Sequence, residues 1–259
     1  MASYLITGAR LCTDQGVVER GWLLTADGRV AGLGAGRLAV KGPAPEPVDA
    51  AGLVLMPGFV DVHVHGGDGA DVMDADPEGL ARMARFHAAH GTTAVVPTTW
   101  AASPDDVRAA VNAVAAVTGP VEGGATIVGV HLEGPWINPA RAGAQDRAQI
   151  RPPDLAEARG LLDSGIVRLV TLAPELEGSA AVIAECRSRG VTVSAGHTEA
   201  TFAQMQAAVD LGLGHVTHTF NAMPSLHHRE SGILAAALTD DRFTAEIIAD
   251  GVHVDPAVV

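Results

Sequence analysis

The sequence predicts an α/β protein: a TIM barrel of the (β/α)8 type that lacks its last strand in this chain, preceded by a small β-sandwich portion. Three observations lead to this prediction. From Leu53 onward, β-like runs alternate with helix-like runs, which is typical of parallel βα units. Ligand-type side chains follow the ends of these β-like runs. A separate group of short apolar runs precedes Leu53.

The composition limits the class of protein and its partners. A chain of 259 residues that is 47% apolar can bury a large core, so one main domain is expected. The formal charge of −13 argues against nucleic acid or a membrane surface as partner. Cys12 and Cys186 form no CxxC pair, and we find no secretory leader or membrane span of ~20 residues, so we expect a cytoplasmic protein.

Residues 1–52 are expected to form part of a small β-sandwich domain. Their apolar runs are short, and Asp27-Gly28 between two of them is typical of a β-hairpin. The stretch 41–47 contains three prolines and is expected to be a connecting loop. Residues 53–259 are expected to form the barrel, truncated before its eighth strand.

The barrel elements follow from hydrophobic runs and helix punctuation. Asp76 as N-cap, Pro77 in the first turn and Gly91 as the stop predict one helix, and Ser103-Pro104 opens the next. A third helix is expected over 179–190. The seven predicted strands are 58–65, 93–98, 126–132, 167–172, 191–196, 214–219 and 244–249.

Metal-ligand side chains recur where these strands end. In a (β/α) barrel the carboxyl ends of the strands converge on the face that carries the active site. His63 and His65 are two residues apart on one strand, so both imidazoles point to the same side. Imidazole and carboxylate groups suit zinc and similar divalent ions. The candidate metal ligands are therefore His63, His65, Glu133, His197 and His218.

Five sequence strings carry a resemblance to a known family. They are PGFVDVHVHG, HLEGPWINP, SAGHTEAT, THTFNAMPSLHHRESG and IIADGVHVDP. Together they resemble the motif set of the N-acetylglucosamine-6-phosphate deacetylase family, within the amidohydrolase superfamily, from about Leu53 to Asp255. The HxH pair alone marks the superfamily, whereas FNAM, LHHRE and ADGVH point to this activity. The resemblance implies an amidohydrolase-type barrel that hydrolyses N-acetylglucosamine 6-phosphate to glucosamine 6-phosphate and acetate.

The resemblance also implies how the ligands are divided. Glu133, His197 and His218 correspond to the metal site found in all members, whereas His63 and His65, with Glu133 as a bridge, imply a second position. The expected cofactor is one or two divalent ions per subunit, zinc first, with iron, manganese or cobalt as alternatives. Such an ion would activate water for attack on the acetamide.

The same motifs imply a set of substrate-binding residues. His253 resembles the histidine that holds the acetamide oxygen and stabilises the oxyanion. Arg229 resembles an arginine that reaches the phosphate of a neighbouring subunit, which implies a homodimer acting on a small-molecule amino-sugar phosphate. Gln145 stands where the family commonly has histidine, and it carries no full charge. The expected set is Ala144, Gln145, Asn221, Ala222, His228, Arg229, Asp250, Gly251, Val252 and His253.

Three interpretations remain open at this point. The first is a longer deacetylase whose catalytic aspartate lies beyond Val259, so that the 259 residues alone would be inactive. The second is another metal-dependent amidohydrolase, acting on a cyclic amide or dipeptide. It is disfavoured because many such relatives bridge their metals with a carboxylated lysine, and the only lysine is Lys41. The third is a non-catalytic truncated barrel.

Overall fold

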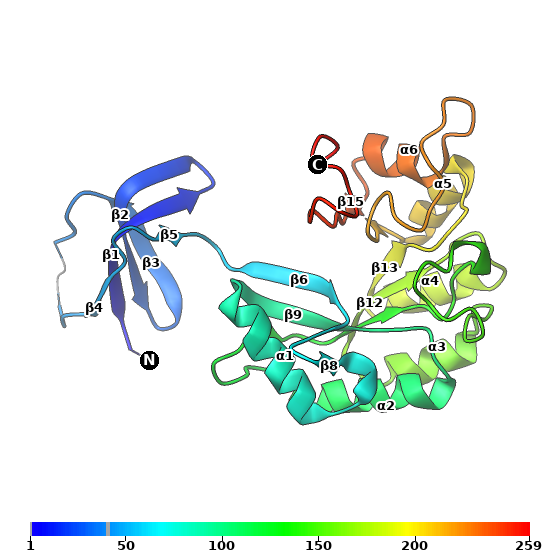
Figure 1. Ribbon diagram of the computed structural model, residues 1–259, viewed down its shortest axis with the longest axis horizontal. Helices are drawn as coiled ribbons and strands as arrows, with labels where there is room; N and C mark the ends of the chain where they lie inside the picture. The colour runs from blue at the N-terminus through cyan, green and yellow to red at the C-terminus, as the bar shows by residue number, and fades with distance from the viewer. Residues whose placement is uncertain (1, 40–41) are drawn as a thin grey trace. The chain divides into compact units, whose positions relative to one another are not determined.

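The structure is a computed structural model that describes residues 2–39 and 42–259. Its contacts divide the chain into two units, Met1–Gly58 and Phe59–Val259. Figure 1 shows the first unit as a sheet without helices and the second as a curved sheet with helices packed against it. No helix in the described ranges is both long and apolar enough to cross a membrane.

The first unit is one sheet of five strands. In order they are β1 (Tyr4–Thr13), β2 (Gly16–Ala26), β3 (Arg29–Ala35), β4 (Glu46–Asp49) and β5 (Val54–Leu55). The sheet order is β3-β2-β1-β4, and β5 also pairs with β1. The predicted hairpin is confirmed: Asp27 and Gly28 form the two-residue turn between β2 and β3, with φ of 52° and 74°. Both residues therefore have the positive φ that a type I′ turn requires.

The predicted loop over 41–47 is shorter in the structure than expected. Lys41 lies outside the described residues, and β4 begins at Glu46, pairing in parallel with β1. Pro47 is tolerated inside this strand because β4 lies at the edge of the sheet, where a missing N–H leaves no neighbouring strand unpaired.

The second unit is built on a parallel sheet, and each of the seven predicted strand regions overlaps at least one of its strands. These are β6 (Phe59–Val64), β9 (Thr92–Thr99), β10 (Thr126–Ile127), β11 (Val130–Glu133), β12 (Val167–Leu172), β13 (Thr192–Ala195), β14 (His215–Val216) and β15 (Thr244–Ala245). They pair in the order β6-β9-β11-β12-β13-β14-β15, with β10 also beside β9. A small hairpin of β7 (Gly66–Gly67) and β8 (Ala70–Asp71) follows β6. The curved parallel sheet is that of a partial TIM barrel, as predicted.

Two strands are shorter than the sequence indicated. The predicted strand 214–219 is regular only at β14, and 244–249 only at β15. The chain beyond β14 leaves the extended conformation because His218, Phe220 and Ala222 have φ of 32°, 81° and 51°. These left-handed residues turn the segment out of the sheet at the end that carries the candidate ligands.

Six helices connect the strands of the second unit. They are α1 (Pro77–Ala89), α2 (Pro104–Val117), α3 (Leu155–Leu162), α4 (Ser179–Ser188), α5 (Phe202–Leu211) and α6 (Gly232–Thr239), with 3-10 turns η1 (Val72–Asp74) and η2 (Pro139–Arg141). The predicted caps are confirmed. The Asp76 carboxylate accepts from the N–H groups of Glu78 and Gly79, and Ser103 Oγ accepts from Asp106 N–H. Each cap satisfies helix donors that have no partner within the helix.

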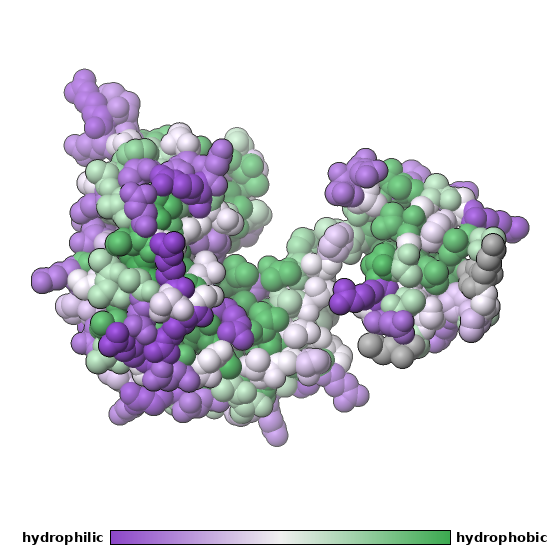
Figure 2. All heavy atoms as spheres, turned by 180° about the vertical axis from the view of Figure 1, so that it is seen from behind, coloured by the Kyte–Doolittle hydropathy of each residue, from purple (hydrophilic) through white to green (hydrophobic). Residues whose placement is uncertain are grey.

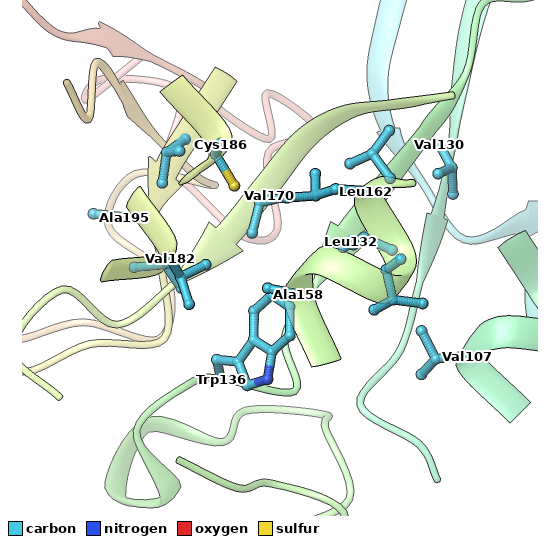
Figure 3. Close-up of a cluster of buried hydrophobic side chains, with 14 of the residues drawn as sticks. Val107, Val130, Leu132, Trp136, Ala158, Leu162, Val170, Val182, Cys186 and Ala195 are labelled. Carbon is cyan, nitrogen blue, oxygen red and sulfur yellow. The ribbon is translucent and has the colours of Figure 1, made fainter. Parts of the chain in front are cut away.

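The core of the second unit lies between the sheet and these helices. Figure 3 shows Leu132 of β11 and Val170 of β12 on the sheet side, with Ala158 of α3 and Val182 of α4 on the helix side. All four side chains are fully buried. On the visible face in Figure 2, hydrophilic and hydrophobic residues are interspersed over each unit. Because Leu132 packs in this core, the core fixes β11 and with it the adjoining residue Glu133.

We expect Leu132→Ala to lower the free energy of unfolding by about 2–5 kcal/mol, because it removes buried methyl groups and leaves a cavity. Urea unfolding measures this loss. Leu226→Ala is the control, since Leu226 is 57% exposed, and its effect should stay within about 0.5 kcal/mol. Equal losses in the two variants would contradict the described core.

Candidate metal and substrate site

Glu133, the last residue of β11, lies at the centre of the site and is 1% exposed. Its Oε1 lies 3.1 Å from the Nε2 atoms of His197 and His218 and 3.2 Å from His63 Nε2. Its Oε2 lies 3.2 Å from His65 Nε2. The structure thus brings all five predicted metal ligands together as two groups that share Glu133.

The fold explains this convergence. His63 lies in β6, His65 directly follows it, and His197 and His218 each come two residues after a neighbouring parallel strand. His197 and His218 have φ of 48° and 32°, a left-handed backbone that costs free energy outside glycine. The surrounding barrel holds these two residues in that conformation, which turns their imidazoles toward Glu133.

Three of the four imidazoles have a defined hydrogen-bond partner at Nδ1. Since carbonyl and carboxylate oxygens only accept here, Nδ1 carries the hydrogen, and a neutral ring then has its lone pair at Nε2. The pairs are His63 with Glu246 Oε2 (3.1 Å), His65 with the Thr98 carbonyl (3.1 Å) and His197 with the Arg141 carbonyl (2.8 Å).

This arrangement fits a divalent metal ion. Nε2 of His197 lies 3.0 Å from Nε2 of His218, and Nε2 of His63 lies 3.3 Å from Nε2 of His65. Lone pairs facing one another and a carboxylate repel unless positive charge lies among them. In zinc sites, one ring nitrogen of a ligand histidine usually binds the metal while the other donates its N–H to an oxygen.

The pKa values agree with a site that favours positive charge. Burial alone would raise the pKa of Glu133, but hydrogen bonds with the four imidazoles lower it well below its usual range. Burial alone would lower the pKa of His63, but hydrogen bonds to Glu133 and Glu246 raise it to about 10. Glu133 therefore stays a carboxylate, and the site stabilises a cation beside it.

Gln145 contacts the metal site directly. It is 5% exposed, its Nε2 donates to Glu133 Oε2 (2.6 Å), and its Oε1 accepts from the Ala101 N–H (2.6 Å). Its expected substrate contact stays a prediction, and the structure adds a hydrogen bond that orients Glu133. This role could not be predicted from the sequence, because the Gln145 side chain is placed between Glu133 and Ala101, which lies 44 residues away.

A cavity of about 850 Å³ opens beside the ligands. The predicted substrate-binding residues that line it are Ala144, Gln145, Asn221, Ala222 and His253. Trp100, which the sequence analysis did not single out, also lines it and stacks on His65 with centroids 3.6 Å apart. The cavity therefore combines metal-ligand groups, amides and the aromatic side chains of Phe59 and Trp100, a composition suited to a small-molecule site.

His253 is held by Asp250 at the rim of this cavity. His253 Nδ1 donates to Asp250 Oδ2 (2.7 Å), and Asp250 Oδ1 accepts from the N–H groups of His253 and Val252. Hydrogen bonds from the His253 backbone and side chain lower the pKa of Asp250 to about 2. Gly251 and Val252 are exposed between them. The short loop thus fixes the direction of the His253 ring.

His228 and Arg229 are exposed and do not line the cavity of their own chain. The Arg229 N–H donates to His227 Nδ1 (3.3 Å), which shapes the loop locally. Their predicted contact with a substrate phosphate therefore stays a prediction. The phosphate expected for Arg229 is that of a neighbouring subunit.

One histidine outside the predicted ligand set lies in the barrel interior. His131 is fully buried, with Nε2 2.7 Å from Thr171 Oγ1 and Nδ1 3.3 Å from Thr98 Oγ1. Burial and neighbouring histidines lower the pKa of His131 well below its usual value. Neutral His131 is thus satisfied by hydroxyl groups. The carboxylate of Glu246, within the predicted strand 244–249, was missed although a charged residue in an apolar strand is a signal.

Comparison with known proteins gives consistent matches. Residues 54–259 match the amidohydrolase family. The chain is 37% identical over 261 residues to N-acetylglucosamine-6-phosphate deacetylase of Bacillus subtilis (strain 168), covering 98% of this chain and 65% of that protein. It is 36% identical over 262 residues to N-acetylgalactosamine-6-phosphate deacetylase of Escherichia coli O157:H7, covering 99% and 67%.

A solved structure gives the same result. The chain is similar to a variant of N-acetyl-D-glucosamine-6-phosphate deacetylase from Mycobacterium smegmatis in complex with N-acetyl-D-glucosamine-6-phosphate. The TM-score is 0.88 with 41% identity, and the match covers 100% of this chain and 66% of that chain. The resemblance drawn from the motifs is confirmed. The chain spans about two thirds of the length of these relatives.

We expect Gln145→Met to weaken metal binding by about 10- to 100-fold, because the bridging carboxylate of Glu133 loses the hydrogen bond that orients it. Titration calorimetry with zinc measures the change. Gln149→Met is the control, since the Gln149 side chain makes no described contact with the ligands. Unchanged metal affinity with a raised KM for substrate would instead favour the substrate-binding role.

Proposed function

The chain belongs to the amidohydrolase family, and on that premise we propose that it supplies the metal site of an enzyme that hydrolyses N-acetylglucosamine 6-phosphate to glucosamine 6-phosphate and acetate. The observation that carries this proposal is the convergence of four imidazoles on buried Glu133 beside a cavity lined by Asn221, Ala222 and His253. The names of the relatives and the FNAM, LHHRE and ADGVH strings support the substrate. The protein would be cytoplasmic and would bind neither nucleic acid nor membrane.

The proposed cofactor is zinc, at one or two ions per subunit. Glu133, His197 and His218 would hold one ion, and His63, His65 and Glu133 the other. A divalent metal, when bound, supplies a Lewis acid and lowers the pKa of water toward neutrality. Glu133 belongs to both groups and, as a carboxylate of low pKa, can serve both.

His253 would bind the acetamide oxygen. Because Asp250 is a carboxylate and accepts at His253 Nδ1, Nδ1 carries a hydrogen, and Nε2 can donate only when the ring is doubly protonated. Asp250 would hold the ring at the rim of the cavity. In its doubly protonated form the ring would donate from Nε2 and stabilise negative charge as it develops on the oxygen.

The sugar phosphate would be bound by several polar groups. Asn221 lines the cavity, and its Nδ2 is buried without a hydrogen-bond partner among the described residues, so it can donate to an anion. Ala144, Ala222, Gly251 and Val252 would contribute backbone contacts. His228 and Arg229 would reach the phosphate of a neighbouring subunit, which makes the active protein a homodimer. A cationic contact of this kind is needed because the chain carries a net charge of −13.

The chain would divide into two domains. Residues 1–52 would belong to a small β-sandwich domain and 53–259 to the barrel. The aspartate that moves the proton from water to the departing amine would lie beyond Val259, as the resemblance implies. The activity is therefore proposed for the full-length protein.

The substrate test compares acetate release by the zinc-loaded full-length protein from three sugars. N-acetylglucosamine 6-phosphate is expected to be hydrolysed much faster than N-acetylglucosamine, because only the first engages the phosphate contacts. N-acetylgalactosamine 6-phosphate tests the preference for the C4 epimer, which the two relatives leave open. Arg229→Met should raise KM for the phosphorylated sugar by at least about 10-fold, the loss of one charge-assisted contact.

Three outcomes would contradict the proposal. Equal rates with and without phosphate would remove the role of Arg229. Turnover of a cyclic amide or dipeptide without turnover of the sugars would favour another amidohydrolase. Metal binding without any hydrolysis would favour a non-catalytic barrel.

We expect His253→Asn to lower kcat by about 10²- to 10³-fold, because the oxyanion loses one charged donor. Steady-state kinetics with N-acetylglucosamine 6-phosphate measures the loss, and zinc content should stay unchanged because His253 is not among the grouped ligands. His90→Asn, on a histidine bonded only to the Phe86 carbonyl of its own helix, is the control. A wild-type kcat for His253→Asn would exclude the oxyanion role.

A further inference from the structure

The carboxylate of Glu246 lies directly behind one of the candidate metal ligands. Glu246 directly follows β15, and its Oε2 accepts from His63 Nδ1 at 3.1 Å. The same oxygen accepts from the His218 N–H at 3.3 Å. Glu246 thus contacts one residue from each of the two groups of candidate ligands, without belonging to either group.

Backbone hydrogen bonds hold the main chain of Glu246 to the neighbouring segment. The Glu246 N–H donates to the Val216 carbonyl at 2.9 Å, and the Glu246 carbonyl accepts from the Thr219 N–H at 2.9 Å. These bonds tie Glu246 on both sides to the segment that carries His218. The main chain of Glu246 is therefore held in place, and its carboxylate is positioned by the contacts with His63 Nδ1 and the His218 N–H.

A chain of polar side chains lies beside Glu246 in the barrel interior. His215 Nδ1 lies 3.4 Å from Glu246 Oε1 and 3.2 Å from Ser194 Oγ, and Ser194 in turn bonds to Thr217. Thr217 Oγ1 lies 2.7 Å from Thr171 Oγ1. Burial lowers the pKa of His215, so this ring is neutral and leaves the charge of the Glu246 carboxylate in place. Glu246 Oε1 has no hydrogen-bond partner among the described residues.

His63 differs from the other candidate ligands in the partner of its Nδ1. His65 and His197 donate to neutral backbone carbonyls, whereas His63 donates to a carboxylate. His218 Nδ1 is buried without a partner among the described residues. A negative partner makes the opposite nitrogen of the ring a stronger electron donor than a carbonyl does, and it fixes the tautomer. Of these rings, His63 is therefore the one whose Nε2 is most strongly activated.

We propose that Glu246 is a positioning residue that holds the Nδ1–H tautomer of His63 and thereby builds the metal position formed by His63, His65 and Glu133. This inference rests on the proposed metal-dependent function. Glu246 acts through His63 and does not itself bind the metal. The position formed by Glu133, His197 and His218 is much less dependent on Glu246, which reaches it only through the His218 backbone.

The test is a zinc titration of the metal-stripped full-length protein, followed by elemental analysis after gel filtration. Wild type should bind two equivalents. Glu246→Gln, which keeps the size but removes the charge, should weaken one of the two sites by about 10- to 100-fold. Cobalt(II) absorption then identifies the remaining site by its own ligand-field bands. Glu185→Gln is the matched control, because the side chains of Glu246 and Glu185 are 13% and 14% exposed. Glu246 contacts His63, and Glu185 contacts Arg159.

A double-mutant cycle separates positioning from general structure. If Glu246 acts through His63, then Glu246→Gln should cause little further loss in a His63→Asn background. Unfolding midpoints of the metal-stripped variants should match that of Glu185→Gln to within a few degrees. Additive losses, or weakening of both metal sites together with a lowered midpoint, would assign Glu246 a structural role and overturn the inference.

The remaining outcomes distinguish this inference from the proposed function. Two sites of wild-type affinity in Glu246→Gln would overturn the inference and leave the function intact. A single site in wild type would also overturn it, because the position that Glu246 builds would not exist. No metal binding in wild type would overturn the proposed function itself.

Discussion

The structure of the second unit depends at its centre on one electrostatic constraint: a buried carboxylate surrounded by four imidazole nitrogens. Glu133 can remain ionised inside the barrel only because His63, His65, His197 and His218 approach it. Three of these rings have their hydrogen on Nδ1, so a lone pair on Nε2 faces Glu133. These lone pairs in turn need positive charge nearby. The ends of four strands are thus held to a common point, and the cavity, the Gln145 contact and the His253 loop are arranged around it.

Much of the fold could be predicted because parallel βα units have a strong sequence pattern. The seven β-like runs, the Asp76 and Ser103 caps and the Asp27-Gly28 hairpin all depend on local physics, and all are confirmed. The lengths of β14 and β15 could not be predicted. The end of β14 is set by left-handed residues such as His218, which the barrel holds in place and which no local preference of histidine favours.

The site could be predicted in part for the same reason. The rule that strand ends converge selects His63, Glu133 and their partners from the sequence alone. It does not select Glu246, Trp100 or the contact of Gln145, because these depend on which distant residues the fold places together. Gln145 meets Ala101 across 44 residues, and Glu246 meets His63 across 183. Such pairs cannot be predicted from the spacing of residues in the sequence, because the three-dimensional fold determines which of them meet.

The wide separation of these partners has a consequence for the order of folding. His197 and His218 lie 64 and 85 residues from Glu133, so no short segment holds a complete set of donors. A loop of this length is costly to close before neighbouring strands have paired. A metal ion held by these residues would therefore not serve as an early nucleus, as it does in small zinc domains. It would bind to a barrel that hydrophobic packing has already assembled, and it would link strands that the core has already placed.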